Sequence, residues 1–514
     1  MQGESRTSKS LLNAKVNMIC FFLSIFMGFY SRKIFIETLG VEFMGLSSTL
    51  SSLLGFLNLA ELGVGQAVAV VLYKPLFDKN RYELTKIISV LGFIYSVIGL
   101  FILIVGIGVS IFLPIIYPNT QFSWDVIYLG FYSYLFSSLL GYFVNYKQNV
   151  LWADQKGYQV TGFFQIIGLV KTIIQILLAT YYRDFIIYFV IEILFSLVYA
   201  FVLHWRVKVT YPWLHTSILQ GRKKYKDYPR IFKLTGQLFI HKMSGFAQFQ
   251  IIPLLIYGYV ALPMVTLYTN YTSVANQVKS FLGGILDSTN AGVGNLIAEG
   301  NKENIFSVYK ELLCLRYFLS GGIACCMYFL SSGFISLWLG RQYILSDIVV
   351  FLIVLQTFFN MARGVNEQFL NGYGLFYDVW APIVETILLL VASMFFGSIY
   401  GLEGVLLGPT LSLFLIVNIW KPYFLFSKGM KISVWKYWSL ICCYVVNMFL
   451  AYFCSKYFLD IVGLDTIGSW MSWVLTAAVY SVVVFVVYFA LLYVSRREMR
   501  TLSRRMIKQV ISKK

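Results

Sequence analysis

Charged and amide side chains recur at helical spacing inside segments that are otherwise apolar. In the segment centred near residue 357, Gln356, Asn360, Arg363, Glu367 and Asn371 follow one another at steps of three or four residues. Such steps place side chains on one face of a helix. An ionised group at the middle of a bilayer costs at least ~2.5 kcal/mol. We therefore expect this face to line a water-filled interior.

Further apolar segments carry similar polar stripes. We interpret their uncharged polar side chains as lining of the same interior. Hydrogen bonds between neighbouring helices explain such residues equally well, so both interpretations stay open. The candidate lining residues are Asn58, Asn145, Gln237, His241, Asn276 and Asn360.

Basic side chains outnumber acidic ones within these segments. A guanidinium binds two phosphate oxygens at once, whereas an ammonium acts as a compact charge. The surplus therefore predicts an anionic substrate, with a phosphate or pyrophosphate group as the natural ligand. Structural alternatives are interfacial anchoring of Arg32, snorkelling of Arg316 and neutralisation of Arg363 by Glu367. The candidate substrate-binding cations are Arg32, Lys171, Lys242, Lys279 and Arg363.

Three carboxylates raise the separate question of ion coupling. Glu61, Asp287 and Glu367 lie within apolar segments, where carboxylates often titrate or bind ions. They could equally balance the nearby cations. Coupling to Na⁺ or H⁺ and simple charge balance both remain hypotheses. No metal site and no other cofactor is expected, because the Cys and His residues show no ligand spacing.

The composition shows which elements must position these residues. The chain is 59% hydrophobic and 12% charged, with a mean hydropathy of +0.73, whereas soluble domains are about 25% charged. Apolar runs of about 20 residues predict about fourteen membrane spans. We therefore predict an all-α polytopic membrane protein whose first span is retained, since no cleavage site follows it.

The distribution of positive charge predicts the topology. With a cytoplasmic N-terminus, most of the 41 lysines and arginines fall in segments expected inside, as the positive-inside rule requires. Both termini are then cytoplasmic. Attraction to the anionic leaflet explains the basic loop and tail more simply than nucleic-acid binding, so no nucleic-acid partner is expected. The only basic residues expected outside are Arg32, Lys33, Arg183, Arg341 and Lys456.

An internal echo predicts two halves. GVGQAVAVVLYKPLFDKNRYELTKI from Gly63 resembles GVGNLIAEGNKENIFSVYKEL from Gly292. Two sets of six spans would then be related by a pseudo-two-fold axis along the membrane normal. The expected parts are an N-terminal six-helix bundle (1–207), a basic cytoplasmic linker (208–232), a C-terminal six-helix bundle (233–430), two further spans (431–495) and a basic cytoplasmic tail (496–514).

The segment Arg32–Pro75 contains LG..FMGL and LAELG.GQA and ends within the motif LYKPL. With FISLWLGRQYIL from Phe334 and GYGLFYDVWAPIVETILLL from Gly372, it resembles the Wzx-type polysaccharide and O-antigen flippases of the multidrug/oligosaccharidyl-lipid/polysaccharide (MOP) exporter superfamily. The resemblance implies a multi-pass protein of the bacterial cytoplasmic (inner) membrane with a central cationic cavity. It provides no set of binding residues that can be carried over, so the candidates above rest on the polar stripes.

The resemblance also implies an activity. Such a flippase translocates undecaprenyl-pyrophosphate-linked oligosaccharide units by alternating access, for capsule, O-antigen or exopolysaccharide synthesis. Its partners would be the polyprenyl-pyrophosphate-linked glycan, membrane lipids, and a polysaccharide polymerase and glycosyltransferases, and a single chain would suffice. A cation-coupled drug exporter of the same superfamily is the alternative. A membrane polymerase or ligase is disfavoured because the outer loops are too short to carry a catalytic site.

Overall fold

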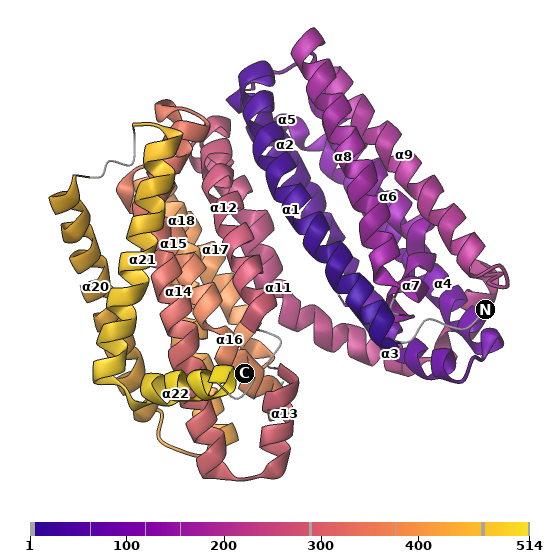
Figure 1. Cartoon of the computed structure of the whole chain (residues 1–514). Helices are drawn as coiled ribbons and strands as arrows, with labels where there is room; N and C mark the ends of the chain where they lie inside the picture. The colour runs from indigo at the N-terminus through magenta and orange to yellow at the C-terminus, as the bar shows by residue number, and fades with distance from the viewer. Residues whose placement is uncertain are drawn as a thin grey trace. The chain divides into compact units, whose positions relative to one another are not determined.

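The computed structural model describes residues 6–61, 63–118, 120–154, 156–286, 290–375, 377–463 and 468–511. Within these ranges, the description leaves out the side chains of residues 6–15, 17, 60, 237, 238, 240–244, 247, 248, 284, 285, 290, 291, 295, 298 and 506–511. Every regular element in the described part is a helix (Figure 1). The predicted all-α class is confirmed.

Eleven of the described helical segments are long and apolar enough to cross a membrane. Nine are single helices: α1 (Arg6–Leu39), α4 (Arg81–Ile111), α6 (Trp124–Phe143), α8 (Gly157–Tyr182), α9 (Phe185–Thr210), α14 (Lys302–Trp338), α17 (Trp380–Tyr400), α20 (Trp435–Val462) and α21 (Trp470–Ser495). Two are composite: Asp347–Gly372 contains α15 (Asp347–Ala362) and α16 (Gly364–Gly372), and Leu402–Met430 contains α18 (Leu402–Ser412), η6 (Leu413–Trp420), α19 (Lys421–Phe424) and η7 (Leu425–Met430).

The other three expected spans are helical but interrupted or more polar. The second is divided into α2 (Val41–Leu57), the 3₁₀ turn η1 (Asn58–Glu61) and α3 (Val64–Phe77). The seventh corresponds to α11 (Pro229–Tyr259) and the eighth to α12 (Leu262–Leu286), which α13 (Asn290–Glu299) follows. These three segments carry four of the candidate lining residues, Asn58, Gln237, His241 and Asn276. The prediction of a polytopic membrane protein is confirmed.

Short-range capping explains where several long helices begin. The Asn80 side chain accepts a hydrogen bond from the backbone N–H of Glu83 at 3.0 Å, at the start of α4. Asp184 accepts from the N–H of Ile186 at 2.6 Å at the start of α9. Each cap satisfies a backbone donor that the first turn of a helix leaves unpaired.

The chain divides into two compact units, Met1–Thr266 and Leu267–Lys514. In the first unit, α1 packs against α8, α8 against α9, and α6 against both α4 and α9 (Figure 1). Helix α11, which was expected to open the second bundle, packs against α2 and α3. The expected bundle and linker boundaries at 207 and 233 stay a prediction.

In the second unit, α14 is the central helix. It packs against α15, α20, α21 and the C-terminal helix α22 (Arg497–Ile511), and α17 packs against α18. Two ion pairs hold α22 to α14, between Arg505 and Glu311 at 2.7 Å and between Lys310 and Glu498 at 3.5 Å. The expected basic tail is therefore a helix docked on the unit.

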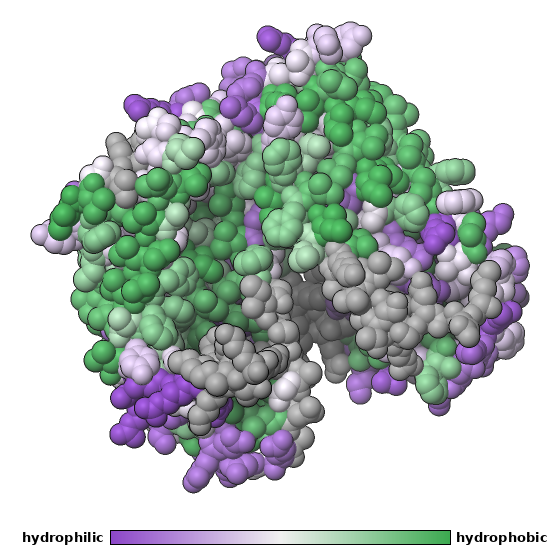
Figure 2. Space-filling model, viewed as in Figure 1, coloured by the Kyte–Doolittle hydropathy of each residue, from purple (hydrophilic) through white to green (hydrophobic). Residues whose placement is uncertain are grey.

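The surface agrees with a bilayer as solvent. Hydrophobic residues cover the middle of the helices, and hydrophilic residues gather at their ends (Figure 2). Many large apolar side chains are exposed, including Phe201 at 74%, Ile115 at 73% and Val494 at 80%. Such extensive apolar exposure is incompatible with water but expected for lipid-facing helices.

Candidate functional site

A cavity of about 510 Å³ lies within the second unit, where α12, α14, α15 and α16 approach one another. This volume is in the range of sites that hold small ligands or ligand head groups. Eight of the twelve lining residues are charged, carry an amide or carry a hydroxyl. The lining residues are Lys279, Ser280, Leu282, Gly283, Arg316, Asn360, Met361, Arg363, Gly364, Glu367, Gln368 and Asn371.

Three cations from three different segments meet at this cavity. Lys279 comes from α12, Arg316 from α14, and Arg363 from the turn between α15 and α16. The only carboxylate among the described lining residues is Glu367. The lining therefore carries a surplus of positive charge, as an anion-binding site requires.

The span that carries Arg363 is interrupted at that residue. Arg363 lies between α15 and α16, and its Nε approaches Glu367 Oε1 at 2.8 Å. The neutralisation of Arg363 by Glu367 that the sequence suggested as a structural alternative is therefore present. The side chain of Glu367 is 47% exposed and that of Arg363 is 26% exposed, so the pair is partly screened by solvent.

Arg316 is the residue that the sequence analysis undervalued. Snorkelling was the expected role, but the residue is only 5% exposed, and its Nε donates to the Met361 carbonyl at 2.6 Å. Its guanidinium lies on the backbone of Gly364, where any Cβ atom would collide with it. Gly364 is thus needed to let the guanidinium reach the cavity.

The polar stripe of this span has two roles along its length. Gln356 donates to the Leu406 carbonyl at 2.9 Å and to the Thr410 hydroxyl at 3.0 Å, so it joins two helices. One turn later, Asn360 lines the cavity. Helix-to-helix bonding and cavity lining, which the sequence left as alternatives, therefore apply to different members of one stripe.

In the first unit, the break in the second expected span holds a second polar cluster. Glu61 accepts hydrogen bonds from the hydroxyls of Tyr95 at 2.8 Å and Tyr142 at 2.9 Å. Asn58 accepts from Ser138 at 2.6 Å and from Tyr142 at 3.1 Å. We call these five residues the Glu61 cluster.

The Glu61 cluster arises from local backbone geometry. Helix α2 gives way to a 3₁₀ turn at Asn58, and Gly63 adopts φ 92° before α3 begins. A left-handed backbone of this kind favours glycine. The turn directs Asn58 and Glu61 toward α4 and α6, which supply the hydroxyl donors. No described basic side chain forms an ion pair with Glu61.

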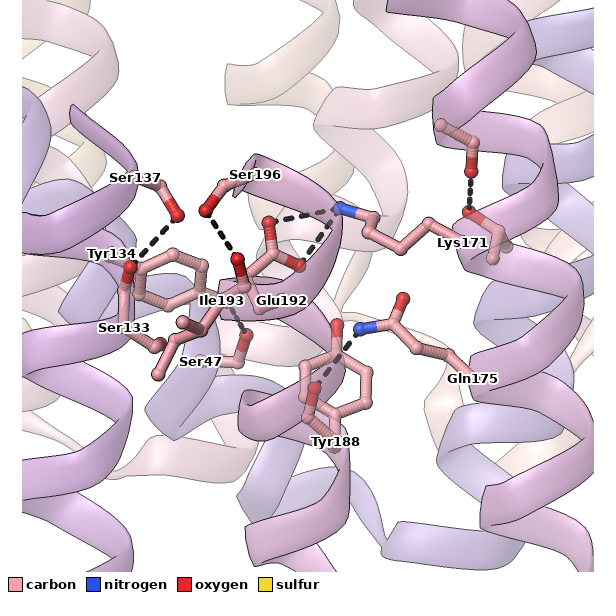
Figure 3. Close-up of polar contacts among 12 residues, drawn as sticks. Ser47, Ser133, Tyr134, Ser137, Lys171, Gln175, Tyr188, Glu192, Ile193 and Ser196 are labelled. Carbon is pink, nitrogen blue, oxygen red and sulfur yellow. Dashed lines mark hydrogen bonds and ion pairs between the residues drawn. The ribbon is translucent and has the colours of Figure 1, made fainter. Parts of the chain in front are cut away.

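Lys171, predicted as a substrate-binding cation, is paired. Its Nζ lies 2.9 and 2.8 Å from the two carboxylate oxygens of Glu192, so α8 and α9 are joined by an ion pair (Figure 3). One turn along α8, Gln175 donates to the Tyr188 carbonyl at 3.2 Å (Figure 3). These contacts give Lys171 a structural partner, and its role in substrate binding stays a prediction.

The remaining candidates are dispersed. Arg32 donates to the Thr266 carbonyl at 3.3 Å, and Asn145, in the 3₁₀ turn that follows α6, is 5% exposed. Asn276 is half-buried on α12 and does not line the cavity described above. Asp287 lies outside the described residues, as do the side chains of Gln237, His241 and Lys242. No group of His, Cys, Asp and Glu that could hold a metal occurs among the described side chains.

Comparisons with known proteins bear on the fold. No protein-family model matches the chain, and no curated protein matches it in sequence. A solved structure of the lipid II flippase MurJ, in an inward closed conformation, aligns with a TM-score of 0.64 and 15% identity, covering 93% of this chain and 98% of that one. An inward-facing multidrug resistance MATE family transporter of the MOP superfamily aligns with a TM-score of 0.57 and 13% identity, covering 82% and 98%.

These likenesses, together with the eleven apolar helices, define the fold. The chain is a multi-pass membrane protein that shares its fold with the lipid II flippase and with the MATE family transporter of the MOP superfamily. Assignment to the Wzx-type flippases within that superfamily stays a prediction.

Proposed function

We propose that this protein is a flippase for polyprenyl-pyrophosphate-linked oligosaccharides, acting by alternating access in the bacterial cytoplasmic membrane with both termini inside. The observation that carries the proposal is the cavity of the second unit, where Lys279, Arg316 and Arg363 meet one carboxylate. A pyrophosphate matches this surplus, because guanidinium groups bind phosphate oxygens in pairs. The likeness to a lipid II flippase supports a lipid-linked substrate.

In this proposal each cation has a distinct task. Arg316 is held by the Met361 carbonyl and Gly364, so its orientation is set before the substrate binds. Lys279 provides a compact positive charge from α12. Arg363 exchanges part of its contact with Glu367 for the substrate, which is feasible because that pair is partly solvated. Capsule, O-antigen or exopolysaccharide synthesis, with its polymerase and glycosyltransferases, would use the product.

The Glu61 cluster is the proposed ion-coupling element. One carboxylate, one amide oxygen and hydroxyl oxygens gather there without a basic partner among the described side chains. Oxygen-rich sets of this kind bind protons or Na⁺. Glu367, by contrast, already balances Arg363, so we propose charge balance as its role.

The direct test is flipping by the purified chain in proteoliposomes. A fluorescent glycan linked to polyprenyl pyrophosphate should be translocated, whereas the same glycan on an uncharged polyprenyl carrier should not. Equal rates for both carriers would contradict a pyrophosphate-binding cavity. Translocation of cationic drugs without movement of either lipid would instead establish the drug-exporter alternative.

A further inference from the structure

Residues 217–228, which lie within the segment expected to be a linker, fold against α4. Helix α10 (Ile218–Lys224) and the turn η3 (Tyr225–Asp227) pack against the beginning of α4. Gly221 sits directly on the Ser89 carbonyl, where an added Cβ would collide, and the Ser217 N–H donates to the Ser89 hydroxyl at 3.2 Å. The segment is therefore docked at one defined place.

Side chains on both sides of α10 strengthen this docking. Tyr225 packs against Phe93 of α4, with ring centroids 5.5 Å apart. The Tyr228 hydroxyl donates to Glu83 at 2.6 Å. Burial, together with the Glu83 carboxylate, raises the pKa of the Tyr228 hydroxyl above its ordinary value. Apolar packing and hydrogen bonds thus occupy the inner side of the segment.

The outer side is strongly basic. Only one described acid lies on it, Asp227, which pairs with Lys224 at 3.5 Å while both side chains stay more than half exposed. Such an exposed pair contributes little attraction and leaves both groups accessible. We call the exposed basic residues the linker surface: Arg222, Lys223, Lys224, Lys226, Arg230 and Lys233.

Apolar side chains flank this charge. Leu219 is 72% exposed and Ile218 is 41% exposed, and both belong to α10 itself. Phe232, at the start of α11, is 46% exposed. Charged groups beside exposed apolar ones, at the ends of spanning helices, match the boundary between head groups and acyl chains. A soluble anion would provide no contact for the apolar residues.

We propose that the linker surface binds the phosphate head groups of anionic phospholipids in the leaflet that the charge distribution assigns to the cytoplasm. Each Lys or Arg near an anionic surface adds roughly 1 kcal/mol of attraction. Because the segment is docked, its cations are presented together without the entropic cost of ordering a flexible loop. This inference concerns lipid recognition and does not depend on the transported substrate.

The test compares lipid retention. The intact chain would be reconstituted in vesicles with equal amounts of phosphatidylglycerol and phosphatidylethanolamine, and the lipids that stay bound after extraction would be counted by native mass spectrometry. K223Q/K224Q/K226Q should lower the preference for phosphatidylglycerol at least about tenfold. The charge-reversal variant K223E/K224E/K226E should lower it further, because repulsion replaces attraction.

A matched control removes the same number of charges elsewhere. R183Q/R341Q/K456Q neutralises three exposed cations from segments expected outside and should leave the preference unchanged. Equal loss in this control would overturn the proposal, since net charge alone would then explain binding. Unchanged retention in both linker-surface variants would also overturn it and would leave an acidic protein as the occupant of this surface.

Discussion

Each unit has an expected membrane span that is interrupted at a charged residue, and the two residues have opposite charge. In Met1–Thr266, a lone carboxylate sits in a helix break and is held by neutral hydroxyl donors from Tyr95 and Tyr142. In Leu267–Lys514, a helix break at Arg363 lies beside two further cations. We propose that similar interruptions of an expected span prepare one unit for a cation or proton and the other for an anion.

The contrast also separates charged residues that pair with each other from charged residues that line a cavity. Lys171 and Glu192 join α8 to α9 as a closed pair, whereas Arg316 and Lys279 converge on a cavity. An ion pair within a bundle is weak evidence of function, because each charge needs a partner in any case. Surplus charge around a cavity is stronger evidence.

The largest expected effect is the loss of Arg316. R316Q should reduce flipping of the pyrophosphate-linked glycan on the order of a hundredfold, because a buried cation would be missing where the anion binds. R316K retains the charge but loses the planar fork, so an intermediate rate is expected. Flipping in proteoliposomes, normalised to the amount of folded protein, measures both.

Two glycine variants sharpen the same point. G364A should mimic R316Q in direction, because its Cβ displaces the guanidinium, while G294A on α13 has open space around the new methyl group and should retain activity. If correctly folded R316Q flips the substrate at the wild-type rate, Arg316 is not needed to bind the anion in the cavity of the second unit.

The next largest effect is expected for the Glu61 cluster. E61Q should lower transport about tenfold and, more tellingly, should abolish any dependence of the rate on a proton or Na⁺ gradient, since the carboxylate is the group that would exchange the ion. Transport at a series of imposed gradients provides the measurement. Retained gradient dependence in E61Q would remove the coupling role and leave Glu61 with a structural one.

For the Lys171–Glu192 pair, stability rather than transport should respond. K171M alone leaves Glu192 without its partner and should destabilise the chain by about 1–3 kcal/mol, less than a fully buried pair because both side chains are partly exposed. K171M/E192M should recover most of that loss. Thermal unfolding in detergent measures both changes in stability. A double variant that is stable but inactive in transport would support a role of Lys171 in substrate binding.

The smallest effect is expected for Glu367. E367Q releases Arg363 from a partly solvated pair, and such pairs are worth about 0–1 kcal/mol. We expect substrate affinity to improve by no more than about fivefold, measured as a lower KM for the pyrophosphate-linked glycan. A large loss of transport would show that Glu367 does more than balance charge.

The sequence was informative about the polar stripe of the segment centred near residue 357. It was less informative about the residues of other helices that meet this stripe. Helical spacing put Asn360, Arg363 and Glu367 on one face, and all three line the cavity. Arg316 lacked such a signal, because one arginine near the end of a span has no periodic neighbours. Its burial depends on Gly364, which is distant in sequence and approaches only in the folded unit.

The pairing of Lys171 could not be predicted for a related reason. Glu192 lies 21 residues away on the next helix, and spacing within one helix does not reveal which residues of its neighbour will face it. The folded linker was equally hidden, because composition reports the charge of a segment and not the side on which it docks.

The amino-acid sequence by itself determined that this protein is helical, spans a membrane and carries cations on defined helix faces. Those properties follow from local rules: apolar run length, the 3.6-residue period and the cost of charge in lipid. Only the tertiary structure decided which cations share a cavity and which are neutralised. The physical reason is that the environment of each charge depends on contacts between helices that are distant in sequence. Gly364 makes room for Arg316, and Glu192 neutralises Lys171.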